Sequence, residues 1–443
     1  MNYSKPNTGL FTLEGERVVV LGAGRSGIAA ANLAVARGAE VRLFDTRDTP
    51  TTTGLNPEVT VIGSATIDLG KATFSDYLVI SPGIDTYGEF VKAFAENTME
   101  MLGELELGFR YYAGTCVGIT GTNGKTTTTE VVAHLINALG KGAEPCGNYG
   151  IPLCELVLQG APEFAVVEAS SFQLETITTF RSKVSIWLNL APDHLDRYPD
   201  MESYRIAKER IFEPLQPDDW KVSRYEEGLS FEKNHKTFST QSSKADYYLS
   251  EGAITCPNGL RVDLKETKLR GLHNIENAMA AIATIDALGL DWTAPPEALM
   301  MDYNPPSHRC EFIRDLDGAE YINDSKSTNL HSLETALNAF SNPLILIVGG
   351  KQKGLNFNVL KGKLAKKIKL CLTIGEIGEE LATLFSSEVE TRYSATLEQA
   401  VKIAHENAIK GDYVLFSPGT SSFDMFSSYM ERGEAFRNAV INL

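Results

Sequence analysis

Gly118-Ile-Thr-Gly121-Thr-Asn-Gly124-Lys125-Thr126-Thr127 decides the fold of this chain, because it joins a strand-like segment to a helix-like segment through a glycine-rich loop. Glycines let a backbone approach a phosphate group closely, and the amides of such a loop and of the following helix point toward that group. Lys125 adds a positive charge, and Thr126 supplies a hydroxyl for Mg²⁺. The stretch predicts an ATP or GTP site made of Gly121, Thr122, Asn123, Gly124, Lys125, Thr126 and Thr127.

The loop has the short Gly-x-x-Gly-Lys-Thr form, since Ile119 stands where the longer P-loop has a glycine. The alternative interpretation is an ordinary turn with an exposed lysine. That interpretation does not explain why two glycines, a lysine and a threonine occur in this order.

Composition limits the class of protein around this loop. The 443 residues suggest three domains at roughly 150 residues each, and 43% hydrophobic residues suffice for packed cores. A net charge of −16, with no basic block, argues against a nucleic-acid-binding protein. Six cysteines without a Cys-x-x-Cys pair predict free, mostly buried thiols in a reducing compartment. No apolar run approaches ~18 residues, so we expect a cytoplasmic chain without a signal peptide or membrane insertion.

The N-terminal segment begins like a βαβ unit. Residues 17–21 form an apolar strand, Gly22-Ala-Gly24-Arg-Ser-Gly27 a glycine loop, and residues 40–45 a second strand that ends at Asp45. This pattern resembles a dinucleotide fingerprint in which Asp45 meets a ribose, although the motif does not say which nucleotide binds. Ser81, after another apolar strand, is a further candidate at the ligand edge. The alternative is a glycine turn needed only for helix–strand packing.

The central segment offers three candidates for chemistry near the P-loop. Glu168 ends a buried strand and could hold Mg²⁺ beside Thr126, or it could be a solvated acid at a strand end. His194, flanked by Asp193, could be a metal ligand or a histidine held by carboxylates. Lys208, taken by itself, reads as a charge on a helix surface. Residues 220–270 suggest an antiparallel meander.

The C-terminal segment has the pattern of a third α/β unit with a cluster of charges. Strands are expected at 321–324, 343–348 and 413–417, with a helix at 333–340. Arg309, Asp324, Lys326 and Lys353 could neutralise a transferring phosphoryl group or grip an acidic substrate. Each residue taken singly reads more simply as solvated surface charge.

Taken together, these stretches resemble the Mur ligase family, the ATP-dependent amino-acid ligases of peptidoglycan synthesis. The resemblance covers nearly the whole chain, and features such as Asp45-Thr46-Arg47 and Ser417-Pro-Gly-Thr-Ser-Ser422-Phe423-Asp424 resemble the branch that adds D-glutamate to UDP-N-acetylmuramoyl-L-alanine. Eight motifs carry it in the family's order: 121–127, 147–150, 168–171, 189–196, Lys208, 273–277, 308–309 and 323–328.

The resemblance implies a role for each matching residue. The catalytic group would be Lys125, Glu168, His194 and Lys208, with one Mg²⁺ near Thr126 and Glu168 and a second near His194 and a carbamylated Lys208. The UDP substrate would contact Arg25, Ser26, Gly27, Asp45, Thr46, Arg47, Ser81 and Asn148. The ATP site would add Asn274, Asn277, Arg309, Asp324 and Lys326 to the P-loop. The D-glutamate pocket would use Thr328, Lys353, Ser422, Phe423 and Tyr429, and Lys351 competes with Lys353 for its position.

The expected fold is α/β in three domains: an N-terminal Rossmann-like domain (1–103), a central P-loop ATPase-like domain with a mostly parallel sheet plus a small antiparallel one (104–306), and a C-terminal Rossmann-like domain (307–443). We expect a monomer. Three other functions remain open: another Mur-type or folylpolyglutamate-type ligase, a nicotinamide-dependent oxidoreductase suggested by the N-terminal glycine loop, and a P-loop switch that only hydrolyses nucleotide.

Overall fold

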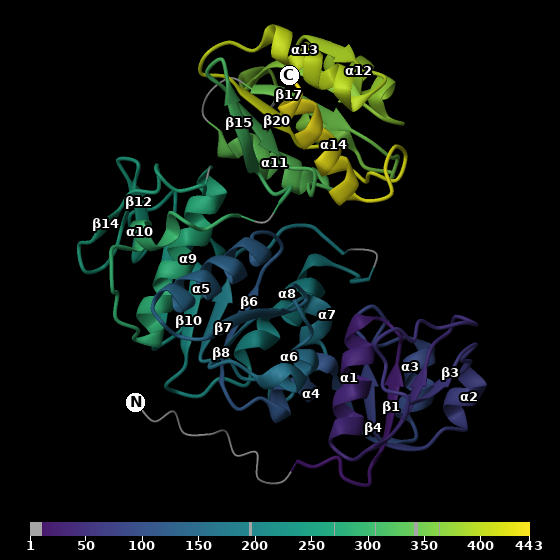
Figure 1. The fold of residues 1–443 in the computed structure, drawn as a ribbon. Coiled ribbons are helices and arrows are strands. Elements are labelled where there is room, and N and C mark those ends of the chain that lie inside the picture. Colours follow the sequence, from purple (N-terminus) through teal and green to yellow (C-terminus); the bar gives the residue numbers. More distant parts are fainter. Residues whose placement is uncertain (1–10, 195–196, 270, 306, 341–343, 363) are drawn as a thin grey trace. The chain divides into compact units, whose positions relative to one another are not determined.

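The computed structural model describes residues 11–194, 197–269, 271–305, 307–340, 344–362 and 364–443 (Figure 1). These residues form two compact units. The first unit holds the described residues up to Tyr248 together with Met279–Pro296, and the second holds those of Leu249–Ala278 and Glu297–Leu443. Both are built from α/β elements, as the sequence predicts.

An entirely parallel sheet opens the first unit. Its strands, in the order β3–β2–β1–β4–β5, are β1 (Arg17–Leu21), β2 (Glu40–Phe44), β3 (Thr60–Ile62), β4 (Ser75–Ile80) and β5 (Thr98–Gly103). Its helices are α1 (Arg25–Ala36), α2 (Ile67–Lys71) and α3 (Glu89–Ala95). Val18 and Val20 share a core cluster with α1, and Val19 and Leu21 share another with α3. Because β1 is covered on both faces, its sequence is apolar throughout rather than alternating.

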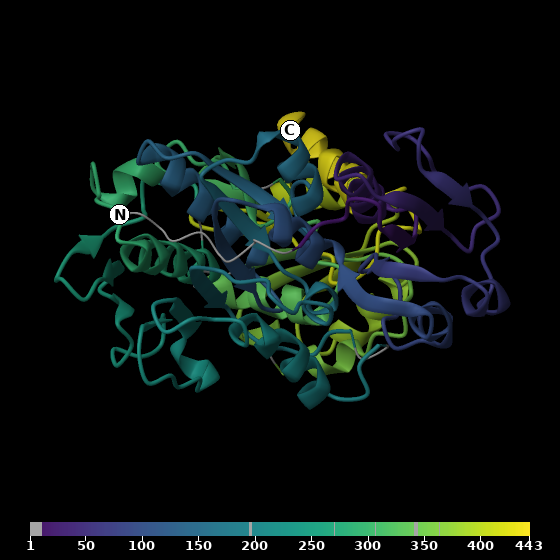
Figure 2. The same ribbon diagram turned by 90° about the horizontal axis from the view of Figure 1, so that it is seen from below.

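A second, mostly parallel sheet carries the predicted P-loop; several of its blue and teal strands are labelled in Figure 1 and seen from below in Figure 2. Its order in the first unit is β12–β11–β10–β9–β6–β8–β7, with β6 (Thr115–Thr120), β7 (Ala143–Gly147), β8 (Phe164–Glu168), β9 (Val184–Trp187), β10 (Trp220–Arg224), β11 (His235–Ser239) and β12 (Tyr247–Ser250). The surrounding helices are α4 (Glu104–Tyr111), α5 (Lys125–Ala138), α6 (Leu153–Gly160), α7 (Ser171–Leu174) and α8 (Met201–Glu209), with 3₁₀ turns η1 (Arg210–Phe212) and η2 (Tyr225–Glu227). Since β6, β8 and β9 are parallel, their carboxyl ends meet at one edge.

The predicted antiparallel meander over residues 220–270 is largely wrong. β9, β10, β11 and β12 pair in parallel, and β13 (Ala253–Thr255) pairs antiparallel with β14 (Arg261–Val262). The turn-rich segments 225–234 and 240–246 carry the chain back to the start of the next strand instead of closing a hairpin. Two helices follow, α9 (Leu272–Leu288) and α10 (Pro296–Met300).

The second unit contains a mostly parallel sheet in the order β15–β16–β20–β17–β18–β19. Its elements are β15 (Glu311–Leu316), β16 (Ala319–Asn323), α11 (Leu330–Ala339), β17 (Leu344–Gly349), η3 (Phe357–Leu360), η4 (Leu364–Lys366), β18 (Ile368–Ile374), α12 (Gly378–Phe385), β19 (Thr391–Tyr393), α13 (Leu397–Asn407), β20 (Tyr413–Phe416) and α14 (Tyr429–Ile441). Among the described residues of this sheet, only β15 and β16 pair antiparallel.

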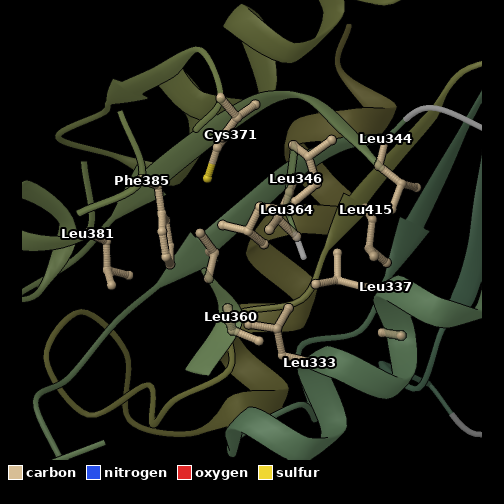
Figure 3. Close-up of a cluster of buried hydrophobic side chains, with 14 of the residues drawn as sticks. Leu333, Leu337, Leu344, Leu346, Leu360, Leu364, Cys371, Leu381, Phe385 and Leu415 are labelled. Carbon is tan, nitrogen blue, oxygen red and sulfur yellow. The ribbon is translucent and has the colours of Figure 1, made fainter. Parts of the chain in front are cut away.

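Helices cover both faces of this sheet. One core cluster joins α11 and α12 to the strands, and Figure 3 shows Leu333 and Leu337 of α11 in the same cluster as Leu344 and Leu346 of β17. The other cluster joins α13 and α14 to the opposite set of strand residues, including Ile345. Because β16, β17 and β20 are parallel, the loops that follow them leave the sheet at one edge. Of the predicted charged residues, Asp324 and Lys326 follow β16, and Lys353 follows β17.

Two composition-based expectations meet the structure directly. All six cysteines are free and buried, as the absence of paired spacing predicts. Among the described residues, no helix has both the length and the hydropathy of a membrane-crossing segment.

Candidate active site

The P-loop runs from the end of β6 into α5 and needs its glycines. Gly124 is the N-cap of α5 and has φ 83°, in the left-handed region that other residues rarely adopt. Gly121 has φ 151°, and a Cβ there would lie 2.9 Å from the Cβ of Leu188. The loop thus packs on the segment after β9 while the amides that open α5 stay directed at the end of the helix, the geometry of an anion site.

Asn189 supports the loop from the neighbouring strand. Its carbonyl accepts a bond from the Thr122 amide (2.9 Å), and its side-chain oxygen accepts one from the Asn123 amide (2.9 Å). The Ala191 amide donates to Thr122 Oγ1 (3.0 Å). The motif around Asn189, known from the sequence only through resemblance, therefore holds the phosphate loop in shape.

Glu168 lies at the centre of a buried polar cluster at the end of β8. Its side chain accepts hydrogen bonds from Thr126 Oγ1 (2.7 Å) and from Asn148 Nδ2 (2.7 Å), and Glu168 is 3% exposed. The alternative of a solvated acid is therefore wrong. A hydroxyl and a carboxylate side by side are oxygen donors of the kind that Mg²⁺ prefers, and Mg²⁺ commonly takes its other ligands from water and phosphates. The pair fits Mg²⁺ next to a nucleotide.

Lys208 is buried, which makes the interpretation as a surface charge wrong. It is 2% exposed; its Nζ donates to the Gly121 carbonyl (2.9 Å) and lies 4.7 Å from the ring centre of Tyr204. Burial and the neighbouring Lys125 ammonium hold the pKa of the Lys208 amine well below its usual range, against the opposite effect of Asp193 and Glu168. The amine therefore tends toward its neutral, nucleophilic form.

His194 lies near the same aromatic side chain as Lys208, that of Tyr204. Its ring centre is 6.0 Å from that of Tyr204 and 4.8 Å from that of Phe172, and its Nε2 is 3.8 Å from Asp193 Oδ2. Tyr204 thus contacts both Lys208 and His194, and sequence reasoning missed it because a tyrosine in a helix usually signals core. Asp196, part of the same motif, lies outside the described residues.

The described residues contain no group of three or more His, Cys, Asp or Glu side chains arranged for a metal ion. A metal here would depend on the Thr126–Glu168 pair together with ligands from a substrate, or on a chemically modified lysine. Lys125 donates from Nζ to the carbonyls of Gly121 and Thr122, both at 2.8 Å. Its charge therefore lies over the loop.

The N-terminal glycine loop is organised by Asp45. The carboxylate accepts bonds from the Ala23 amide (2.8 Å), from the Arg47 amide (2.9 Å) and from Arg47 Nε and Nη2 (both 2.8 Å). The Arg47 guanidinium holds the pKa of the Asp45 carboxyl well below its usual range. Because both oxygens serve the loop and Arg47, Asp45 differs from the ribose-facing acid that a dinucleotide site requires. This arrangement weakens the oxidoreductase interpretation.

The other predicted UDP contacts gather around this loop. Ser81 Oγ donates to the Gly22 carbonyl (3.1 Å), and Arg25 Nη1 donates to the Gly150 carbonyl (2.6 Å), next to Asn148. Ser26 is half-buried and Thr46 is exposed. A Cβ at Gly27 would clash with the Gly22 backbone, so Gly27 serves close packing of α1 on the loop.

In the second unit, Asp324 is buried directly after β16. It accepts bonds from Ser417 Oγ (2.7 Å) and from the Cys310 amide (3.2 Å). Burial raises the pKa of the Asp324 carboxyl to about 7, against these bonds and the nearby Arg309 charge. The reading of Asp324 as a solvated surface charge is therefore wrong.

Lys326 and Tyr429 contact each other, with Nζ 3.9 Å from the ring centre. Of the other residues predicted for this pocket, Ser422 is buried, Thr328 is half-buried, and Lys353 and Phe423 are exposed. The Lys351 backbone pairs with Ser421, whose carbonyl accepts a bond from the Lys351 amide (2.9 Å).

Asn274 and Asn277 lie buried on one face of α9, where Asn277 Nδ2 donates to Asn274 Oδ1 (3.2 Å). The structure thus brings Lys125, Thr126, Glu168 and Lys208 together in the first unit, and Asp324, Lys326 and Tyr429 in the second. The convergence of the two groups on one site stays a prediction.

Comparison with known proteins identifies three family domains along the chain. The MurD-like N-terminal domain of Mur ligases matches residues 16–103, the Mur ligase middle domain matches 119–285, and the Mur ligase glutamate ligase domain matches 308–419. Together they reproduce the order of the three segments read from the sequence.

Similar proteins extend over the full length of the chain. A Thermoanaerobacter pseudethanolicus protein named UDP-N-acetylmuramoylalanine--D-glutamate ligase is 35% identical, with 97% of this chain and 99% of that protein covered. A Geotalea daltonii protein of the same name is 38% identical, with 97% and 98% covered. Among solved structures, the MurF ligase from Thermotoga maritima in complex with ADP has a TM-score of 0.60 at 17% identity, covering 97% of this chain and 96% of that one, which shows a shared fold.

Proposed function

Because the chain belongs to the Mur ligase family, we propose that it is the ATP-dependent ligase that joins D-glutamate to UDP-N-acetylmuramoyl-L-alanine in peptidoglycan synthesis. The observation that carries this proposal is full-length similarity above 30% identity to proteins named for that reaction. The Thr126–Glu168 pair at the end of the P-loop supports the ATP-dependent part independently, since the sequence pattern and the geometry agree there.

The chemistry needs an activated carboxyl group. The carboxylate of the muramoyl-alanine substrate attacks the γ-phosphorus of ATP, which releases ADP and forms an acyl phosphate. The amine of D-glutamate then attacks the acyl carbon, the amide bond forms, the amine loses a proton, and phosphate leaves. Direct condensation would expel hydroxide at neutral pH, so phosphate makes the step feasible.

The first step brings two anions together, so positive charge must neutralise them. Lys125 supplies one charge over the P-loop, and Thr126 and Glu168 would hold a Mg²⁺ ion. When bound, such an ion neutralises phosphate charge and orients the oxygens. Asn148 restrains the Glu168 carboxylate in the required place through its 2.7 Å hydrogen bond.

A second Mg²⁺ would be held by His194 and a carbamate on Lys208. Burial and the adjacent Lys125 charge favour the neutral Lys208 amine, which can add to CO₂ with loss of a proton and so become an anionic oxygen ligand. The placement of Tyr204 against both Lys208 and His194 supports a common site for the two side chains. The ammonium group of D-glutamate must lose a proton before its nitrogen can attack, and the ring nitrogen of His194 that does not bind the ion is our candidate acceptor.

We propose that the substrates bind to three domains, which comprise residues 1–103, 104–306 and 307–443. UDP would lie at the N-terminal glycine loop, where Arg47 is fixed by Asp45 and Arg25 and Ser81 adjoin. The nucleotide would add Asn274, Asn277, Arg309, Asp324 and Lys326 to the P-loop, and D-glutamate would contact Thr328, Lys353, Ser422, Phe423 and Tyr429. We propose a cytoplasmic monomer, since six buried free thiols suit a reducing compartment.

The test is phosphate release from ATP and Mg²⁺ with UDP-N-acetylmuramoyl-L-alanine, against D-glutamate, L-glutamate, L-alanine and diaminopimelate. Release with D-glutamate alone, with one ligated product by mass, supports the proposal. Release with another amino acid would move the enzyme to a different Mur-type or folylpolyglutamate-type activity. Nucleotide hydrolysis that ignores every acceptor would favour a switch protein, and NADH binding by fluorescence would revive the oxidoreductase.

A further inference from the structure

Arg432 is a buried cation in α14 that the reaction scheme leaves without a role. It is 1% exposed, and all three of its nitrogens donate: Nε to Ser325 Oγ (3.1 Å), Nη2 to the Ser325 carbonyl (2.8 Å) and Nη1 to the Thr420 carbonyl (3.1 Å). Burial lowers the pKa of Arg432 to about 10, so the guanidinium stays charged at neutral pH. The charges of Asp424 and Asp324 oppose this lowering of the pKa, although no ion pair among the described residues joins Arg432 to a carboxylate.

These contacts link loops from three neighbouring strands. Ser325 follows β16 and Thr420 follows β20, while Thr420 Oγ1 donates to the carbonyl of Lys351 after β17 (2.7 Å). In the sheet, β20 pairs in parallel with both β16 and β17, so the three loops emerge at one edge. Ser325 Oγ also donates to the Tyr429 carbonyl at the start of α14 (2.8 Å).

Every segment in this network carries a residue of the proposed amino-acid pocket. The loop after β16 continues to Thr328, the loop after β17 to Lys353, and the loop after β20 to Ser422, while Tyr429 begins α14. Arg432 itself is buried, and its hydrogen-bond partners are two backbone carbonyls and one hydroxyl of these loops.

We propose that Arg432 is the positioning residue of the amino-acid pocket: by binding the loops after β16 and β20, and through Thr420 the loop after β17, it fixes the spacing of the residues that hold glutamate. This inference rests on the proposed function, which assigns the pocket. A planar guanidinium reaches two loops at once with fixed geometry, whereas an ammonium is a single point charge on a flexible chain. The charges of Asp424 and Asp324 act on the buried guanidinium, but its hydrogen bonds run to the loops after β16 and β20 and not to a carboxylate.

The test is Arg432→Lys, which keeps the charge and removes the fork. We expect the KM for D-glutamate to rise about tenfold or more, the effect of losing one hydrogen bond from a charged donor. The KM for the UDP substrate, which we place on the N-terminal glycine loop, should not change. A folded Arg432→Lys enzyme with the wild-type KM for D-glutamate would overturn the inference.

Arg314→Lys is the matched control at the other end of the same helix. Arg314 Nη1 donates to the carbonyls of Val440 (3.3 Å) and Ile441 (3.2 Å), so its replacement loosens α14 without touching the three loops. It should lower the melting temperature and leave the KM for D-glutamate unchanged. An equal rise in KM in this control would show that Arg432 acts only through helix stability, and would overturn the inference.

Thr420→Val decides the matter should Arg432→Lys fail to fold. It removes the bond to the Lys351 carbonyl and keeps the carbonyl that Arg432 binds, so a raised KM for D-glutamate supports loop spacing and an unchanged KM contradicts it. The wild-type enzyme separates the two proposals. Absence of D-glutamate ligation there would overturn the proposed function, whereas normal ligation with unaltered variants would overturn only the role of Arg432.

Discussion

Replacing Gly27 with alanine should damage the fold of the N-terminal glycine loop, and replacing Gly24 should damage only ligand binding. A Cβ at Gly27 would lie 2.7 Å from Ser81 Oγ and still closer to the Gly22 carbonyl, whereas ordinary contact begins at 3.4 Å. The close neighbour is backbone, so the loop itself must shift. Overpacking of this kind costs about 1–3 kcal/mol, and the backbone clash places Gly27→Ala at the upper end. That cost corresponds to a melting temperature lower by roughly 5 °C or more.

Gly24→Ser is the matched variant on the same loop. A Cβ at Gly24 meets no atom within 4 Å, its φ is −86°, and serine is at least as good an N-cap for α1 as glycine. Its melting temperature should therefore equal that of the wild type. If the UDP group approaches this open position, the added side chain should raise the KM for the UDP substrate.

Thermal unfolding without ligands and the KM for the UDP substrate, measured on both variants, separate the two effects. A Gly27→Ala protein that melts like the wild type would refute the close-packing argument. A Gly24→Ser enzyme with an unchanged KM for the UDP substrate would remove the UDP group from this loop.

Three further predictions, each made for a substitution or a pair of substitutions, test the rest of the proposed site. Lys208→Ala should lose turnover and regain part of it when acetate or formate is added, because these acids replace the carbamate. Lys125→Ala should lose turnover by roughly 10²–10³-fold and should not be rescued by these acids. Equal rescue of both variants, or of neither, would contradict a carbamate on Lys208. Lys353→Ala should raise the KM for D-glutamate far more than the KM for ATP, and a larger effect in Lys351→Ala would transfer the role to that residue. Asp324→Asn tests how the stability of the fold depends on pH, because the pKa of the Asp324 carboxyl rises from 3.8 in the unfolded chain to about 7 in the folded one. The wild-type side chain stabilises the fold when it is protonated, and this contribution is lost as the pH rises from 4 through 7. The variant should therefore gain melting temperature relative to the wild type between pH 5 and pH 8, and parallel profiles would show that the carboxyl titrates normally.

Features that depend on neighbouring residues in sequence were predictable. The P-loop needs two glycines three positions apart, followed by a lysine and a threonine, and the structure has them at the junction of β6 and α5. Glu168 could be paired with Thr126 beforehand because the carboxyl ends of parallel strands share an edge.

Features that depend on packing between distant segments were not predictable in the same way. The sequence around Lys208 is typical of an exposed position on a helix. In the fold the side chain is buried, and its amine donates a hydrogen bond to the carbonyl of Gly121, which lies 87 positions away in the sequence. Arg432 sits in a polar C-terminal helix and gives no sign that Ser325 and Thr420 surround it. The parallel pairing of β10–β12 was also missed, since short strands with turn-rich connections are typical of hairpins.

One isotope measurement tests directly whether the substrate carboxylate is activated by phosphoryl transfer. UDP-N-acetylmuramoyl-L-alanine labelled with ¹⁸O in its terminal carboxylate is incubated with ATP, Mg²⁺ and D-glutamate, and the released phosphate is weighed by mass spectrometry. An acyl-phosphate path leaves one carboxylate oxygen on phosphorus, so the account predicts phosphate with one ¹⁸O for each amide bond formed. Unlabelled phosphate alongside ligated product, or label found in AMP, would contradict the account.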